Sequence, residues 1–194
     1  MTQTRPELTG NFGMVASTHW LASAVGMSIL ERGGNAFDAA AATGFTLQVV
    51  EPHLNGPGGE VPMLLSVAES DEIQVVAGQG PAPAGATIEH FTSLGLELVP
   101  GTGHLAACVP GAFDAWLTLL ERFGTLPLPD VLAPAIHYAR HGYPVLPSIA
   151  RTISLVTPSS CSSSTNTQLN SPYSPRRGLL RTKAGAIKRR WVVE

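Results

Sequence analysis

Apolar residues recur at helical spacing near the start of the chain. Over residues 19–32 they lie three or four positions apart and would share one face of a helix, as at Leu21, Val25 and Ile29. Gly33 and the glycine after it predict the end of this helix, because glycine adopts the left-handed C-cap conformation at little cost. The short apolar stretch before it, residues 13–17, predicts a strand.

A second helix is predicted from Asn35 to about Val50. Asn35 is a favoured N-cap residue, and Asp38 places negative charge in the first turn. Pro52 disfavours helical backbone at the residue before it, so the helix should end there. The run of four alanines, residues 39–42, predicts a helix that is buried on most of its surface and closely approached by a neighbour.

A hairpin is predicted next. Residues 61–68 and 73–77 are apolar runs of strand length, and polar residues 70–72 separate them. Residues 55–59 contain three glycines and a proline, which predict a tight turn in which glycine permits positive φ and close packing. Helices then follow at residues 112–122 and 131–141, the second capped by Asp130. This mixed order of helices and strands indicates the α+β class.

Composition divides the chain into three parts. Residues 1–10 form a polar arm, residues 11–152 a domain, and residues 153–194 a Ser/Thr-rich and then basic tail for which we predict disorder. Residues 1–155 hold five Arg, no Lys and 13 Asp or Glu, whereas residues 156–194 hold seven Lys or Arg and one Glu. The tail is interpreted as a readthrough, frameshift or unspliced segment, in preference to a basic tail for nucleic acid or membrane.

The side chains of the sequence do not make up a complete active site that can be recognised from their pattern. The glycine-rich turn follows a helix and precedes a strand, the reverse of a phosphate-binding loop. His137 and His141 are four residues apart on a predicted helix but have no third ligand, so we expect no metal site. Cys108 lies in an apolar run and is predicted to be buried and inert. No catalytic residue is assigned, and no cofactor is expected.

Several strings of this sequence resemble the heavy chain of γ-glutamyltransferases (glutathione hydrolases). They cover about residues 11–150 in the order of that family: residues 13–17, His19, residues 29–42, Val50-Glu51-Pro52, residues 55–60, Pro110-Gly111 with Trp116, residues 134–136 and residues 142–145. The most specific are Gly-Gly-Asn-Ala-Phe-Asp-Ala-Ala, residues 33–40, and Asn-Gly-Pro-Gly-Gly-Glu, residues 55–60.

The resemblance implies an N-terminal nucleophile hydrolase fold, an αββα sandwich that is incomplete here. It also implies a precursor that cuts itself into a heavy and a light chain, whose new N-terminal threonine transfers a γ-glutamyl group from glutathione or related amides to water or amino acids. The matched residues do not include that threonine. The implied partners are therefore a small γ-glutamyl or acyl-amide substrate and the light chain of the same precursor.

The family usually has an arginine after the second strand of the hairpin, which pairs with the substrate α-carboxylate. Gln79 occupies the matching position and is predicted to bind substrate. Glutamine lacks the charge and bidentate geometry of arginine, so strict γ-glutamyl specificity is in doubt and an acylase-like branch is an alternative. A non-catalytic fragment with a basic tail is the other alternative. With no signal peptide visible, a cytoplasmic location without nucleic-acid or membrane partners is expected.

Overall fold

The computed structural model describes residues 7–68, 70, 72–101 and 103–153, and two short strands near the C-terminus. Its elements, in order, are helices α1 (Trp20–Glu31) and α2 (Ala36–Val50), strands β1 (Val61–Ser66) and β2 (Ile73–Gly78), helix α3 (Ile88–Ser93), the 3-10 helix η1 (His104–Ala106), and helices α4 (Ala112–Phe123) and α5 (Leu128–His141). A helical segment over residues 147–153 follows. Strand β3 (Leu179–Arg181) pairs antiparallel with β4 (Ile187–Arg189). The rest of the predicted disordered tail lies outside the described residues.

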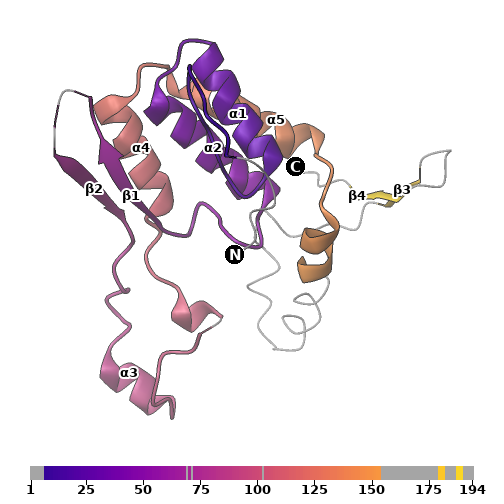
Figure 1. Ribbon diagram of the computed structural model, residues 1–194. Coiled ribbons are helices and arrows are strands. Elements are labelled where there is room, and N and C mark those ends of the chain that lie inside the picture. The colour runs from indigo at the N-terminus through magenta and orange to yellow at the C-terminus, as the bar shows by residue number, and fades with distance from the viewer. Residues whose placement is uncertain are drawn as a thin grey trace.

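Helix α2 is the centre of the helical layer and packs against α1, α4 and α5 (Figure 1). Ten of its 15 residues are buried, as the alanine run predicts. Its apolar residues form one cluster with residues from α1 and α5, including Val25, Ile29, Phe45, Val131 and Ala135. The position of every other element in the helical layer therefore depends on how α2 is held.

Helices α1 and α2 lie unusually close together where Gly26 faces α2. A Cβ atom added at Gly26 would lie 2.2 Å from Thr43 Oγ1 and 3.3 Å from the carbonyl oxygen of Ala39. Only a glycine fits at that separation without displacing its neighbours. The predicted close approach of a neighbour to the alanine-rich helix is confirmed by this contact.

The start of α2 has a complete capping box. The Asn35 side chain accepts hydrogen bonds from the backbone N–H groups of Phe37 (2.9 Å) and Asp38 (3.0 Å), and the Asp38 carboxylate accepts one from the Asn35 N–H (3.0 Å). The N-cap predicted at Asn35 is confirmed. Asn35 also donates through Nδ2 to the carbonyl oxygen of Phe123 at 2.6 Å, which joins this turn to the end of α4.

Strands β1 and β2 form the predicted antiparallel hairpin, with Val61 opposite Gly78 and Ser66 opposite Ile73. One face of the hairpin packs on α4, where Met63 and Leu65 are buried with residues of that helix. The opposite face is exposed and apolar, with Leu64, Ile73 and Val75 each more than 60% exposed. Among the described residues, no third strand joins this sheet.

Three local predictions differ from the structure. Residues 13–17 are not a strand. Helix α5 begins at Leu128, three residues before the predicted start, because Pro129 fits the first turn, where no backbone N–H is needed. Glycines 56, 58 and 59 do not have positive φ, which is found at Gly33, Gly95, Gly103 and Gly142 instead. The end of α1 at Gly33 is thus confirmed, and the glycine-rich turn is formed without left-handed backbone.

The chain leaves the hairpin after β2 and makes a long excursion before α4. This excursion carries α3 and η1 and projects away from the helical layer (Figure 1). Cys108 lies in it and is exposed, which corrects the prediction that it is buried. Residues 107–110 are all exposed, so the apolar character of this stretch did not indicate burial.

Candidate functional site

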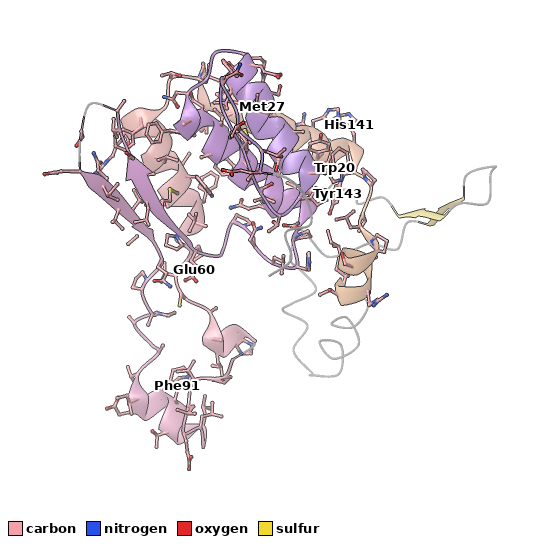
Figure 2. The ribbon with its side chains drawn as sticks, viewed as in Figure 1. Trp20, Met27, Glu60, Phe91, His141 and Tyr143 are labelled. Carbon is pink, nitrogen blue, oxygen red and sulfur yellow. The ribbon has the colours of Figure 1, made fainter. Side chains whose placement is uncertain are left out.

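Glu60 and Gln79 lie together at the open end of the hairpin. Glu60 immediately precedes β1 and Gln79 immediately follows β2, so the strand register places them opposite each other, next to the pair Val61–Gly78. Gln79 Nε2 donates a hydrogen bond to Glu60 Oε2 at 2.5 Å, and both side chains are exposed. Glu60 is labelled in Figure 2 at the end of the hairpin from which the excursion leaves. The predicted substrate-binding residue therefore has a carboxylate as its neighbour.

The backbone around this pair is held tightly by residues that begin α4. The carbonyl oxygen of Gly59 accepts hydrogen bonds from the N–H groups of Gly111 (3.3 Å) and Ala112 (3.0 Å). A Cβ atom at Gly111 would lie 2.8 Å from the carbonyl oxygen of Gly78, and one at Gly80 would lie 1.5 Å from that of Val109. The backbone before and after Gln79 is therefore closely approached by the segment that leads into α4, which fixes the position of Gln79. Only glycine fits at Gly80 and Gly111 without displacing these neighbours.

Hydrogen-bond acceptors dominate the surface that the pair presents. One N–H of Gln79 is used by Glu60, which leaves the amide oxygen of Gln79 and the other carboxylate oxygen of Glu60 as acceptors, with one amide N–H. The sequence has no Lys or Arg between Arg32 and Arg122. This end of the hairpin is therefore suited to a group that donates hydrogen bonds or carries positive charge, and unsuited to a carboxylate.

A second polar cluster is buried at one end of the helical layer. His19 is the N-cap of α1, Glu51 the C-cap of α2, and Tyr143 follows α5; they are 0%, 5% and 6% exposed. The hydroxyl of Thr18 donates to Glu51 Oε2, and the rings of His19 and Tyr143 meet edge to face at 6.5 Å. Figure 2 shows Trp20 and Tyr143 together at this end, away from Glu60. Sequence reasoning missed this cluster, because its members are far apart in the chain.

The hydrogen bond at the start of α1 determines the tautomer of His19. Its Nδ1 accepts a hydrogen bond from the N–H of Leu21 at 3.2 Å, so the proton of the neutral ring is on Nε2. Burial lowers the pKa of His19, although the Glu51 carboxylate acts in the opposite direction. A proton on Nδ1 would also face the Leu21 N–H and remove this cap. The folded state therefore favours the neutral imidazole.

This preference predicts an acid-dependent loss of stability. Histidines of the unfolded chain bind a proton near pH 6.5, whereas folded His19 binds one only at lower pH, so the unfolded state holds more protons in that window. We expect the free energy of unfolding to fall as the pH drops below about 6.5, by at most about 1.4 kcal/mol per pH unit. Urea unfolding from pH 7.5 to 5.0 measures it.

His19→Asn provides the matched variant, because asparagine is a strong N-cap residue that does not titrate. The acid-dependent loss should become smaller in this variant and stay unchanged in His137→Gln, where an exposed histidine is removed. Equal pH dependence in all three proteins would contradict the assignment to His19.

The other candidates from the sequence have no active-site geometry. The rings of His137 and His141 lie with their centroids 4.4 Å apart and their planes tilted by 32° at the end of α5. Among the described residues, no group of three metal-ligating side chains gathers. Their position at a helix C-terminus suits partial positive charge. None of the described helices is long and apolar enough to cross a bilayer.

Comparison with known proteins gives one consistent result. The family model described as Gamma-glutamyltranspeptidase matches residues 22–181. The chain is 42% identical over 137 residues to the glutathione hydrolase-like YwrD proenzyme of Bacillus subtilis (strain 168), covering 70% of the chain and 26% of the relative. It is 40% identical over 154 residues to the acylase ACY 1 proenzyme of Pseudomonas sp. (strain V22), covering 75% and 27%.

A solved structure agrees with these relatives. The crystal structure of Helicobacter pylori gamma-glutamyltranspeptidase matches with a TM-score of 0.78 and 31% identity, over 96% of this chain and 52% of that chain. The predicted α+β class and its assignment to the N-terminal nucleophile hydrolase fold, as an incomplete αββα sandwich, are confirmed. The chain spans about a quarter of the length of the curated relatives it matches.

Proposed function

Because the chain belongs to the γ-glutamyltranspeptidase family, we propose that it supplies the first part of an enzyme that transfers an acyl group from a small amide. The nucleophile of such an enzyme would lie in the remaining three-quarters of the family polypeptide, which is the partner that this part requires. The names of both curated relatives describe proenzymes, which supports a precursor that is processed.

The unpaired hairpin supports a polypeptide partner of this kind. Its outer face exposes Leu64, Ile73 and Val75, and both strands have a free edge among the described residues. Exposed apolar sheet surface of this sort is normally covered by another part of the protein. Further strands of the remaining polypeptide would pair at these edges and cover this face.

The Glu60–Gln79 pair supports an acylase-like preference over strict γ-glutamyl specificity. A substrate α-carboxylate would meet the acceptor oxygens of both side chains, with no cationic side chain in that part of the sequence. Hydrogen bonds to charged groups contribute about 1.5–3 kcal/mol, so exchanging arginine for this pair removes a large part of carboxylate recognition. We propose that Gln79 and Glu60 contact the acyl chain of the donor and favour an amine-bearing chain over a carboxylate-bearing one.

A chimera tests the proposed function. Residues 11–150 of this chain replace the matching part of the Bacillus subtilis hydrolase-like proenzyme, to which the chain is 42% identical. We expect the chimera to cut itself into two pieces, visible by gel electrophoresis and mass spectrometry, and to release p-nitroaniline from an acyl p-nitroanilide. The unaltered relative is the positive control, and this chain by itself gives the baseline. A soluble, folded chimera that neither processes itself nor turns over any acyl anilide would overturn the proposal.

Three p-nitroanilides of equal chain length then separate the chemical groups. The γ-glutamyl compound carries a carboxylate and an ammonium, the glutaryl compound only the carboxylate, and the 4-aminobutanoyl compound only the ammonium. We expect the chimera to favour the 4-aminobutanoyl compound over the glutaryl one. Gln79→Arg should raise kcat/KM for the glutaryl compound about 10–100-fold, and Glu60→Gln should weaken the preference for the ammonium. A processed chimera that favours the glutaryl compound would exclude this assignment while leaving the family function intact.

A further inference from the structure

The buried cluster at the end of the helical layer contains polar atoms with no partner. His19 Nε2 and the hydroxyl of Tyr143 are both fully shielded from solvent and make no hydrogen bond within the described part of the chain. Leaving a buried polar group unpaired costs about 1–3 kcal/mol, so native proteins seldom leave two such groups in one place. These two atoms belong to rings that are in edge-to-face contact.

Glu51 contributes a buried carboxylate to the same cluster. Its carboxylate acts electrostatically on both rings, raising the pKa of His19 against the effect of burial and, after burial itself, raising that of Tyr143, which reaches about 12. The hydroxyl of Thr18 occupies one acceptor position of Glu51 Oε2, and a carboxylate has about four. The cluster therefore combines two unsatisfied donors with spare acceptor capacity.

The tautomer of His19 decides what kind of guest fits. Because Nδ1 accepts from Leu21, Nε2 carries a proton and cannot ligate a metal ion. A cation would face this N–H, and an anion would face the carboxylate of Glu51. A neutral molecule that accepts and donates hydrogen bonds satisfies all three groups, and water is small enough for such a buried position.

We propose that one internal water molecule binds here, accepting hydrogen bonds from His19 Nε2 and Tyr143 Oη and donating one to the carboxylate of Glu51. Three hydrogen bonds are typical of a buried structural water. The water links the start of α1, the end of α2 and the segment after α5. It also stabilises the beginning of the loop that leads to Glu60, since the carbonyl oxygen of Glu51 accepts from Leu54 (3.0 Å) and Asn55 (3.3 Å).

The test uses the full chain labelled with 15N. We expect the Nε2–H of His19 to be protected from exchange and to give a rotating-frame cross-peak at the water frequency that persists in Tyr138→Phe. Thermal unfolding followed by circular dichroism provides the second measurement. Tyr143→Phe should lower Tm by about 2–4 °C, because it removes a bond to the water, whereas Tyr138→Phe should change Tm much less.

Two outcomes of these measurements would contradict a bound water molecule. If the Tyr143 hydroxyl were unpaired, Tyr143→Phe would leave Tm unchanged or raise it, since an unsatisfied buried group would be removed. If the side chains bonded directly to one another, Tm would fall without a water cross-peak at His19. Either result would overturn the proposal. A high-resolution crystal structure of the chain would show the water between these three side chains directly.

Discussion

Replacing Asp38 with alanine is expected to lower the free energy of unfolding by about 3–4 kcal/mol. Asp38 is fully buried in the first turn of α2. Its two carboxylate oxygens accept hydrogen bonds from the N–H of Asn35 (3.0 Å), the N–H and hydroxyl of Thr125 (3.1 and 2.7 Å), and the N–H of Leu126 (3.3 Å). Alanine would leave these buried donors without an acceptor.

The effect should be large because this one carboxylate joins two separate parts of the fold. It completes the capping box of α2 and also holds the connection between α4 and α5, some 87 residues further along the chain. Donors that lose a charged acceptor cost more than those that lose a neutral one. Water that enters the site would restore some of these bonds, which is why the expected loss is smaller than their sum.

Urea unfolding at pH 7 measures this prediction, with Asp114→Ala as the matched control. Asp114 is also in the first turn of a helix, α4, but it is exposed. Its removal should cost no more than about 0.5–1 kcal/mol through the helix dipole. Asp38→Asn should give an intermediate loss, because its amide keeps one acceptor oxygen. Equal effects for Asp38→Ala and Asp114→Ala would show that the buried hydrogen bonds contribute nothing beyond the helix dipole.

Local sequence signals predicted the elements that depend on neighbouring residues. The cap at Asn35, the helix end at Gly33 and the hairpin rest on interactions within a few positions, and each is confirmed. Helix α3 was not predicted, because six residues offer too little periodicity to stand out from the excursion around it. The exposure of Cys108 depends on which other segments pack against it, and the local sequence pattern carries no information about those segments.

The residues of the candidate sites show the same difference between local sequence signals and long-range packing. Gln79 was reached through the resemblance to a family, and its role in binding substrate stays a prediction. Its pairing with Glu60 follows from the strand register, so the hairpin signal contained it in principle. The cluster of His19, Glu51 and Tyr143 lies at three helix ends that are separated by up to 124 positions in the numbering. Only the packing of α2 against α1 and α5 brings these ends to the same part of the fold.

The second large effect is expected at Gly44, in the middle of α2. In a solvent-exposed helix, replacing glycine with alanine stabilises by about 1 kcal/mol. Here a Cβ atom would lie 2.3 Å from Cζ2 of Trp116 and 2.6 Å from its Cε2, so the indole ring of α4 must move. Overpacking of this kind costs about 1–3 kcal/mol, and a rigid ring held between two helices should place the cost at the upper end. We therefore expect Gly44→Ala to lower the free energy of unfolding by about 2 kcal/mol, because the cost of overpacking exceeds the gain in helix propensity.

A double-mutant cycle with Trp116→Phe locates the cause. Phenylalanine lacks the part of the indole that meets the added methyl group, so the double variant should be more stable than the sum of the single effects by about 1–2 kcal/mol. Gly58→Ala is the control for the substitution itself, because no atom lies within 4 Å of its added Cβ and its φ is not positive. A stabilised Gly44→Ala variant, or strictly additive effects, would mean that α2 and α4 are not as close as the structure places them. Coupling between the two substitutions would instead show that α4 approaches the α2 backbone directly at Gly44, as α1 does where its Gly26 faces Ala39 and Thr43 of α2. The small residues of α2 would then be explained by the close approach of these two helices.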